Sequence, residues 1–244
     1  MAEDFAEQNL TPLHFSAIDC EKTRNLSLKW GRTIMAQWLA ALDMSSIITQ
    51  LIIMAVAYLI GSINTAIIVG KLKSNIDIRE HGSGNAGMTN AMRTMGKTSG
   101  ILVLLGDVLK AVIVMTVTLV IFRDEPTYLY IAGAGAVLGH NFPIYFGFKG
   151  GKGVLVSLVA IMFAHPIIGL AALVISLVTM VIWRYVSLGS IVGAISTVAF
   201  AFMLELDGYL IAYFLFLAVL CLKMHSSNVV RLINGEENKI GVKK

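Results

Sequence analysis

Long stretches without a charged side chain are the feature that most limits what this chain can fold into. Residues 45–70 contain no Asp, Glu, Lys or Arg, and neither do residues 153–183. A helix of about 20 residues, rising about 1.5 Å per residue, crosses the hydrocarbon core of a bilayer. Only helices and closed barrels satisfy their backbone groups there, and barrel strands alternate apolar with polar residues. Because these stretches are continuously apolar, the sequence predicts an all-α, polytopic integral membrane protein.

The number of spans follows from the loops between the apolar stretches. Further stretches cover residues 99–122, 127–148, 186–204 and 208–222. Residues 153–183 are long for one span and short for two, but Pro166 near the middle disfavours helix at the residue before it. Two spans there place the basic loops at residues 71–97 and 149–152 on the same side as the basic C-terminal tail, as the positive-inside rule requires. We therefore expect about seven transmembrane helices, with the N-terminus outside and the C-terminus in the cytoplasm.

Composition excludes several other classes of protein. Only 14% of the residues are charged, against about 25% in soluble domains. The net charge of +4 comes with basic residues in short loops, so it indicates membrane orientation and no nucleic-acid partner. The two cysteines form no metal-binding pattern, and we expect no metal and no cofactor. Residues 1–44 are polar and form a predicted extension, or reflect a start codon assigned too early, ahead of a membrane domain at 45–244.

Three polar clusters, at residues 78–93, 140–153 and 225–231, stand out from the apolar background. All three lie on the predicted cytoplasmic side. Each combines small residues with hydroxyls, amides and cations. Glycine-rich loops that open a helix offer backbone N–H groups to anions, and Lys and Arg add charge-assisted bonds to phosphate oxygens. The clusters therefore predict a site for phosphorylated ligands at the membrane surface, which fits an enzyme or a transporter of a phosphorylated metabolite.

The three clusters also carry a resemblance to a known family. The first reads Gly82-Ser-Gly-Asn-Ala-Gly-Met-Thr-Asn90 and is followed by Arg93. The second reads Gly139-His-Asn-Phe-Pro143 and then Gly147-Phe-Lys-Gly-Gly-Lys-Gly-Val154, and the third contains His225-x-x-Asn228-x-x-Arg231. In this order and spacing they resemble the motifs of the PlsY family, bacterial membrane glycerol-3-phosphate acyltransferases that use acyl phosphate. One departure is the Ser226-Ser227 pair, where the family commonly has a charged pair.

The resemblance implies a function and a set of site residues. It implies transfer of a fatty acyl group from acyl phosphate to the 1-hydroxyl of glycerol 3-phosphate, giving lysophosphatidic acid and phosphate in phospholipid biosynthesis. The donor would come from a soluble or peripheral phosphate acyltransferase, and the enzyme would sit in the bacterial inner membrane with its site facing the cytoplasm. The implied catalytic residues are Ser83, Lys152 and His225. The implied substrate-binding residues are Gly82, Gly84, Asn85, Thr89, Asn90, Arg93, Gly150, Gly151, Gly153, Ser190 and Asn228.

One charged pair falls inside a predicted span. Asp107 and Lys110 are three residues apart, so they share one face of a helix. We interpret them as a structural pair, because opposite charges at depth in a membrane are stable only when they meet.

Overall fold

The computed structural model describes residues 44–241, and the part from Thr49 onward forms one compact unit. The described residues form helices and loops without a strand. The helices are α2 (Met44–Gly61), α3 (Thr65–Ser74), α4 (Met88–Met95), α5 (Lys97–Ile121), α6 (Pro126–Asn141), α7 (Val154–Ala164), α8 (Pro166–Trp183), α9 (Val186–Met203), α10 (Gly208–Met224) and α11 (Ser226–Ile233), with short 3-10 turns at Ile78–Glu80 and Ile144–Phe146. The prediction of an all-α fold is confirmed.

Small residues let the helices approach one another closely. A Cβ atom at Gly61 of α2 would collide with the Ala136 carbonyl of α6, and one at Gly139 of α6 would collide with the Tyr58 carbonyl of α2. Such contacts between backbones are typical of helix pairs in membranes. Large apolar side chains such as Leu105 and Leu109 of α5 are exposed instead. This inside-out distribution is the one expected of helices surrounded by lipid.

The charged pair predicted within a span is present and buried. Lys110 Nζ lies 2.9 Å from Asp107 Oδ1, and the two side chains expose 7% and 3% of their surface. The pairing predicted from the i, i+3 spacing is confirmed, while its structural role stays a prediction.

The long apolar stretch at residues 153–183 is divided at the predicted place. Helix α7 ends at Ala164 and α8 begins at Pro166. Between them, His165 has an extended backbone, and its Nδ1 accepts a hydrogen bond from the Ile168 N–H at 3.3 Å. The histidine therefore caps the second helix, and the expected division into two segments is confirmed.

Helices occur at every segment predicted to span the membrane, but their lengths differ. Among residues 44–241, four helical segments are long and apolar enough to cross a membrane: Met44–Ser74, Lys97–Ile121, Pro166–Trp183 and Val186–Met203. The pair α10–α11, bent by 61°, is a fifth if it counts as one span. Helix α7 is apolar but has only 11 residues. Seven spans, and the sides on which the termini lie, stay predictions.

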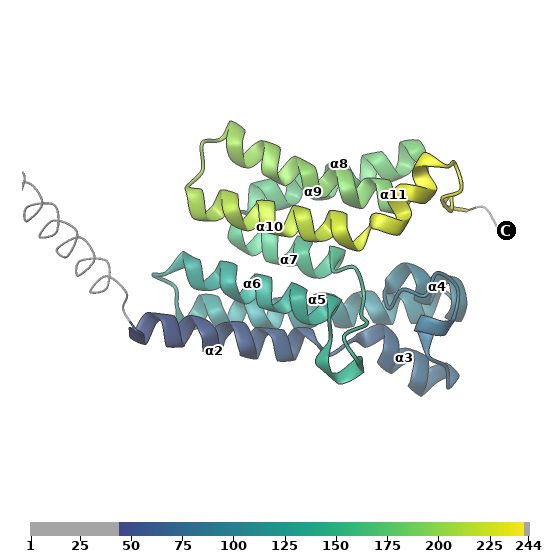
Figure 1. Cartoon of the computed structure of the whole chain (residues 1–244), viewed down its shortest axis with the longest axis horizontal. Coiled ribbons are helices and arrows are strands. Elements are labelled where there is room, and N and C mark those ends of the chain that lie inside the picture. Colours follow the sequence, from purple (N-terminus) through teal and green to yellow (C-terminus); the bar gives the residue numbers. More distant parts are fainter. Residues whose placement is uncertain (1–43, 242–244) are drawn as a thin grey trace, which may run out of the picture. The chain divides into compact units, whose positions relative to one another are not determined.

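The long helices bring the three polar clusters toward one end of the unit. Figure 1 shows α3, α4 and α11 beyond the same ends of the long helices, away from the turn that joins α9 to α10. The loop that connects α6 to α7 also extends toward this end. Segments far apart in the sequence are thereby placed close enough to form a common site.

Candidate functional site

The first glycine-rich loop is folded around the side chain of Asn90, the third residue of α4. Asn90 is buried, accepts a hydrogen bond from the Ser83 N–H at 2.8 Å, and donates to the carbonyls of Ile78 at 3.1 Å and His81 at 2.8 Å. Both amide hydrogens are thus used within the loop. Asn90 holds the loop in shape, while Ser83 lies exposed at its tip. The predicted substrate contact of Asn90 itself stays a prediction.

Two glycines give this loop a path that other residues would resist. Gly82 and Gly84 have φ angles of +62° and +71°, in the left-handed region that favours glycine. A Cβ atom at Gly82 would also overlap the Asn90 side chain. Asn85 follows, half-buried, and Thr89 and Arg93 are exposed on α4, where their side chains form no hydrogen bond to a residue in the range 44–241. Arg93 is therefore available to an anionic ligand.

The second loop uses its glycines differently from what the sequence suggested. The N–H groups of Gly150 and Gly151 donate to the carbonyls of Asn141 and His140, each at 3.1 Å. These two glycines consequently have no N–H group free to bind a phosphate, and this part of the expectation is corrected. They are required because a Cβ atom at either position would collide with His140. Donors for an anion remain at Lys152, Gly153 and the first turn of α7.

A buried amide beside the start of α7 was not among the predicted site residues. The Asn141 side chain is 1% exposed, and neither its nitrogen nor its oxygen has a hydrogen-bond partner among the described residues. Its oxygen faces Gly153, which has a φ of +75° and directly precedes the first residue of α7. Buried amides are nearly always hydrogen-bonded, so this one requires a water molecule or a ligand. Its position within the second motif was visible in the sequence, but its lack of a partner was not.

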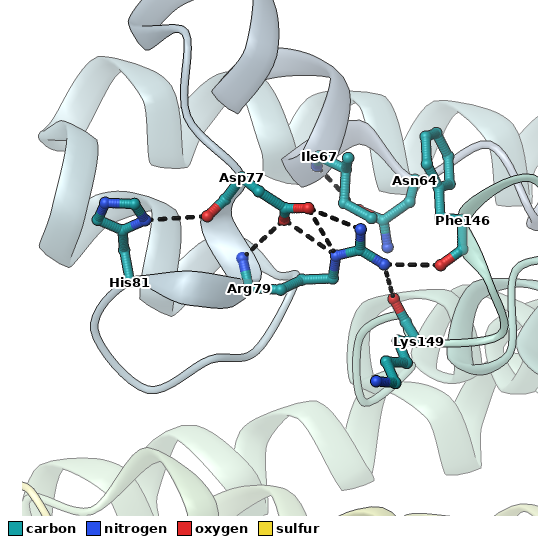
Figure 2. A network of polar contacts seen from close by, with 7 residues as sticks. All are labelled: Asn64, Ile67, Asp77, Arg79, His81, Phe146 and Lys149. Carbon is teal, nitrogen blue, oxygen red and sulfur yellow. Dashed lines mark hydrogen bonds and ion pairs between the residues drawn. The ribbon is translucent and has the colours of Figure 1, made fainter.

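Arg79 joins the first loop to the second, as Figure 2 shows. Its Nη2 lies 2.6 Å from Asp77 Oδ2 and its Nη1 donates to the Phe146 carbonyl at 2.6 Å and to the Lys149 carbonyl at 3.3 Å. The hydrogen bonds from Arg79 lower the pKa of Asp77 to about 2. The planar fork of a guanidinium suits this combination of a carboxylate and two carbonyls. The residues just before Lys152 are thereby tied to the loop that carries Ser83.

Lys152 joins the second motif to the third. Its Nζ donates to Asn228 Oδ1 on α11. Asn228 Nδ2 in turn donates to Glu237 Oε1 at 2.9 Å, and Arg231 Nε donates to Glu237 Oε2 at 2.8 Å. Partial burial lowers the pKa of Lys152 to about 8, although the charge of Glu237 opposes the shift. The motifs predicted from sequence are therefore in direct contact here.

Glu237 is a site residue that the sequence did not reveal. It follows the third motif in the C-terminal tail, and only 8% of its side-chain surface is exposed. The tail is held in place by Arg184, whose backbone carbonyl accepts from the Ile240 N–H at 2.7 Å and whose Nη2 donates to the Ile240 carbonyl at 2.7 Å. Because the Glu237 carboxylate accepts a hydrogen bond from Asn228 Nδ2, the Asn228 oxygen is turned toward Lys152.

His225 lies buried at the end of α10, three residues before Asn228. Its Nδ1 is 2.9 Å from the Cys221 carbonyl. A carbonyl oxygen can only accept, so Nδ1 carries the proton and Nε2 is left as an acceptor. Ser190, on α9, is buried next to this helix, where the Cys221 thiol contacts its carbonyl at 3.8 Å. The Ser190 hydroxyl donates to the Val186 carbonyl at 3.0 Å in its own helix.

Comparisons with known proteins all point to one family. A family model described as glycerol-3-phosphate acyltransferase matches residues 51–235. A glycerol-3-phosphate acyltransferase of Clostridioides difficile (strain 630) is 43% identical over 202 residues, covering 81% of this chain and 98% of the relative. One of Bacillus subtilis (strain 168) is 40% identical over 189 residues, covering 78% and 96%.

Solved structures agree. The crystal structure of PlsY (YgiH), an integral membrane glycerol 3-phosphate acyltransferase, in its glycerol 3-phosphate form has a TM-score of 0.74 and 36% sequence identity. It covers 79% of this chain and 96% of that one, and the lysophosphatidic acid form gives a TM-score of 0.72. The alternative of a transporter is thereby set aside. The chain belongs to the PlsY family of integral membrane glycerol-3-phosphate acyltransferases.

Proposed function

We propose that this acyltransferase takes its acyl group from acyl phosphate and transfers it to the 1-hydroxyl of sn-glycerol 3-phosphate. The products are lysophosphatidic acid and inorganic phosphate. The observation that carries the proposal is the contact of Lys152 with Asn228, which places a cation and an amide from two motifs beside the start of α7. Cations and free N–H groups at a helix start suit a ligand with phosphate oxygens.

The protein itself needs to take little part in making and breaking covalent bonds in this reaction. The hydroxyl oxygen of glycerol 3-phosphate attacks the acyl carbonyl carbon, an ester bond forms, and the bond from carbon to the phosphate oxygen breaks. Acyl phosphate is already activated, so the protein mainly has to hold two anionic ligands together and stabilise developing charge. Lys152 and Arg93 supply positive charge, and Ser83 and Asn85 position the substrates from the first loop.

We further propose that no acyl-enzyme forms on Ser83. Its loop is occupied by structural hydrogen bonds, and the nearby histidine, His81, directs Nδ1 toward the Asp77 carbonyl at 2.9 Å. The proton of the attacking hydroxyl goes to the departing phosphate. The acceptor Nε2 of His225 orients the hydroxyl. Trapping an acyl ester on Ser83 would overturn this part of the mechanism.

The location of the site extends the proposal. The basic loops at residues 71–97 and 149–152 support a location of the three motifs on the cytoplasmic side of a bacterial inner membrane. A soluble or peripheral phosphate acyltransferase would supply the donor there. The acyl chain would enter from the bilayer between helices. The extension at residues 1–44 would be dispensable for the reaction of the membrane domain at 45–244, and residues 1–43 lie outside the part that the structure describes.

The test is an assay of the purified protein in detergent. Acyl phosphate and glycerol 3-phosphate together should give lysophosphatidic acid and phosphate in equal amounts, and omission of either substrate should abolish both products. Acyl-CoA at the same concentration should be a poor donor. Equal rates with acyl-CoA would contradict the choice of donor while leaving the acyltransferase activity intact.

A further inference from the structure

The buried ion pair of α5 extends to a third residue, His140, at the end of α6. Lys110 Nζ donates to the Ile63 carbonyl at 2.7 Å and lies 2.9 Å from Asp107 Oδ1 and 3.0 Å from His140 Nδ1. Thr65 Oγ1 donates to the same Asp107 oxygen at 3.2 Å. Three ionisable side chains thus share one enclosed site, which is a costly arrangement inside a membrane unless it serves a purpose.

The geometry fixes the orientation and the tautomer of His140. An ammonium group has three N–H donors and no acceptor, and Lys110 has three neighbours that can use them. Nδ1 of His140 is one of these neighbours, so it accepts and the ring proton is on Nε2. The alternative, donation from Nδ1 to Asp107 Oδ1, would need the longer distance of 3.5 Å and would set two donors against each other.

The other edge of the His140 ring touches the second loop. A Cβ atom at Gly151 would collide with Nε2 of His140 and crowd the Ala86 carbonyl of the first loop. The backbone carbonyl of His140 also accepts the Gly151 N–H at 3.1 Å. His140 therefore contacts Gly151 through both its backbone and its ring, and Gly151 directly precedes Lys152.

We propose that His140 is a positioning residue for acyl transfer, held by the Asp107–Lys110 pair and acting through Gly151 on the place of Lys152. The chain of contacts runs from the buried carboxylate through Lys110 and the imidazole to the loop. Its last step sets where Lys152 Nζ meets Asn228. The inference rests on the role proposed above for Lys152.

Two substitutions test the two edges of the His140 ring separately. In His140→Asn, the side-chain oxygen can occupy the place of Nδ1 and still accept from Lys110, but nothing fills the space beside Gly151. We expect folded protein with thermal unfolding close to that of the wild type and a kcat/KM lower by about 10- to 100-fold, because misplacement of a binding group by about 1 Å has effects of this size. His140→Gln reaches the place of Nε2, and we expect its kcat/KM to lie closer to the wild-type value.

A double-mutant cycle with Lys152→Ala gives the readout that a merely structural role would not move. If His140 acts through Lys152, adding His140→Asn to Lys152→Ala should lower kcat/KM no further. His165→Asn is the matched control, because this histidine caps α8 beyond the far end of α7. Its effect on kcat/KM should combine with that of Lys152→Ala multiplicatively.

The outcomes distinguish this inference from the proposal on which it rests. Wild-type kinetics in Lys152→Ala would overturn the role of Lys152 and the inference together. An impaired Lys152→Ala with multiplicative effects in the cycle, or wild-type kinetics in His140→Asn, would overturn the inference alone. If His140→Asn does not fold, the same cycle with His140→Ser decides, because serine also leaves the space beside Gly151 unfilled.

Discussion

Lys152 and Asn228, 76 residues apart in the sequence, meet through a hydrogen bond from Nζ to the amide oxygen. The contact joins the start of α7 to α11 and is supported from behind by Glu237, which accepts from the Asn228 Nδ2 at 2.9 Å. An amide can turn over and exchange its oxygen and nitrogen, so the carboxylate behind it decides which group faces the lysine. The cation of the site is therefore oriented by a residue of the C-terminal tail.

Replacing Glu237 by Gln should weaken catalysis without a large loss of stability. A glutamine can still approach Asn228, but it lacks the charge that holds Arg231 and favours the protonated form of Lys152. We expect kcat/KM to fall about tenfold or more, as for loss of a hydrogen bond to a charged group worth about 1.5–3 kcal/mol. Glu236→Gln is the control, because Glu236 is the exposed neighbour with the same charge. Equal losses in the two variants would show that only the charge of the tail matters.

The pH dependence of the reaction should report the lowered pKa of Lys152. Burial places this pKa at about 8 instead of 10.5, so the free enzyme loses the cation as pH rises through 8. We expect kcat/KM to fall above that pH, since kcat/KM follows ionisation of the free enzyme. In Lys152→Arg the charge persists to much higher pH, and the fall should disappear even if the rate at pH 7 is lower. The same fall in Lys152→Arg would assign it to another group.

The lowered pKa of Lys152 changes stability with pH in the direction opposite to its effect on activity. Between pH 8 and 10.5 the unfolded chain binds more protons at Lys152 than the folded one. The contribution of Lys152 to stability therefore rises with pH over this window, while activity falls.

We expect that lysine cannot replace Arg79 without impairing substrate binding. Lysine keeps the charge but cannot reach the Asp77 carboxylate and the carbonyls of Phe146 and Lys149 together. We predict that Arg79→Lys raises the KM for glycerol 3-phosphate by about tenfold, the effect of one charge-assisted hydrogen bond. Lys149→Ala serves as the control, because its exposed side chain is removed while the carbonyl that accepts from Arg79 at 3.3 Å remains. A wild-type KM in Arg79→Lys would mean that the two loops keep their places without this contact.

Topology reporters can test the proposed orientation. A reporter at Asp124 or Asp207, in the turns away from the three motifs, should be found outside the cell membrane. One fused to the C-terminus should be found in the cytoplasm. The physical reason is the basic character of the loops on the motif side, at residues 71–97 and 149–152. An external C-terminus would show that seven spans with an external N-terminus is the wrong arrangement.

The sequence predicted the helices and the pair of charges on α5 because these depend on local patterns. Uninterrupted apolar runs specify membrane helices, and Pro166 marks the break that begins α8. The motifs also located the loops that meet. The spacing of the motif residues along the chain could not show which backbone N–H groups of those loops are hydrogen-bonded within the protein. Gly150 and Gly151 looked like phosphate donors, yet their N–H groups are bonded to carbonyls of α6.

Long-range contacts explain what the sequence did not predict. Glu237 reaches Asn228 only because the tail turns back and is fastened to Arg184. His140 meets Lys110 only because α5 and α6 pack together. Neither contact has a signature in the spacing of residues along the chain, since both depend on how separate helices pack.

The most direct test of the account compares Lys152→Ala with Lys110→Ala in kinetics and thermal unfolding. Lys152 lies in a loop, its contact in the structure is with the neutral amide of Asn228, and its proposed ligand is a phosphate, so its loss should leave the protein folded. We predict that kcat/KM falls about 10- to 100-fold, from a charge-assisted bond worth about 1.5–3 kcal/mol. Lys110 neutralises Asp107 inside α5 at 2.9 Å. Removing it leaves a buried charge unpaired, at a typical cost of about 3–5 kcal/mol.

Lys110→Ala should therefore show a lower melting temperature or a lower yield of folded protein, whereas Lys152→Ala should unfold like the wild type and react slowly. The account is contradicted if Lys152→Ala is fully active while Lys110→Ala is as stable as the wild type but inactive.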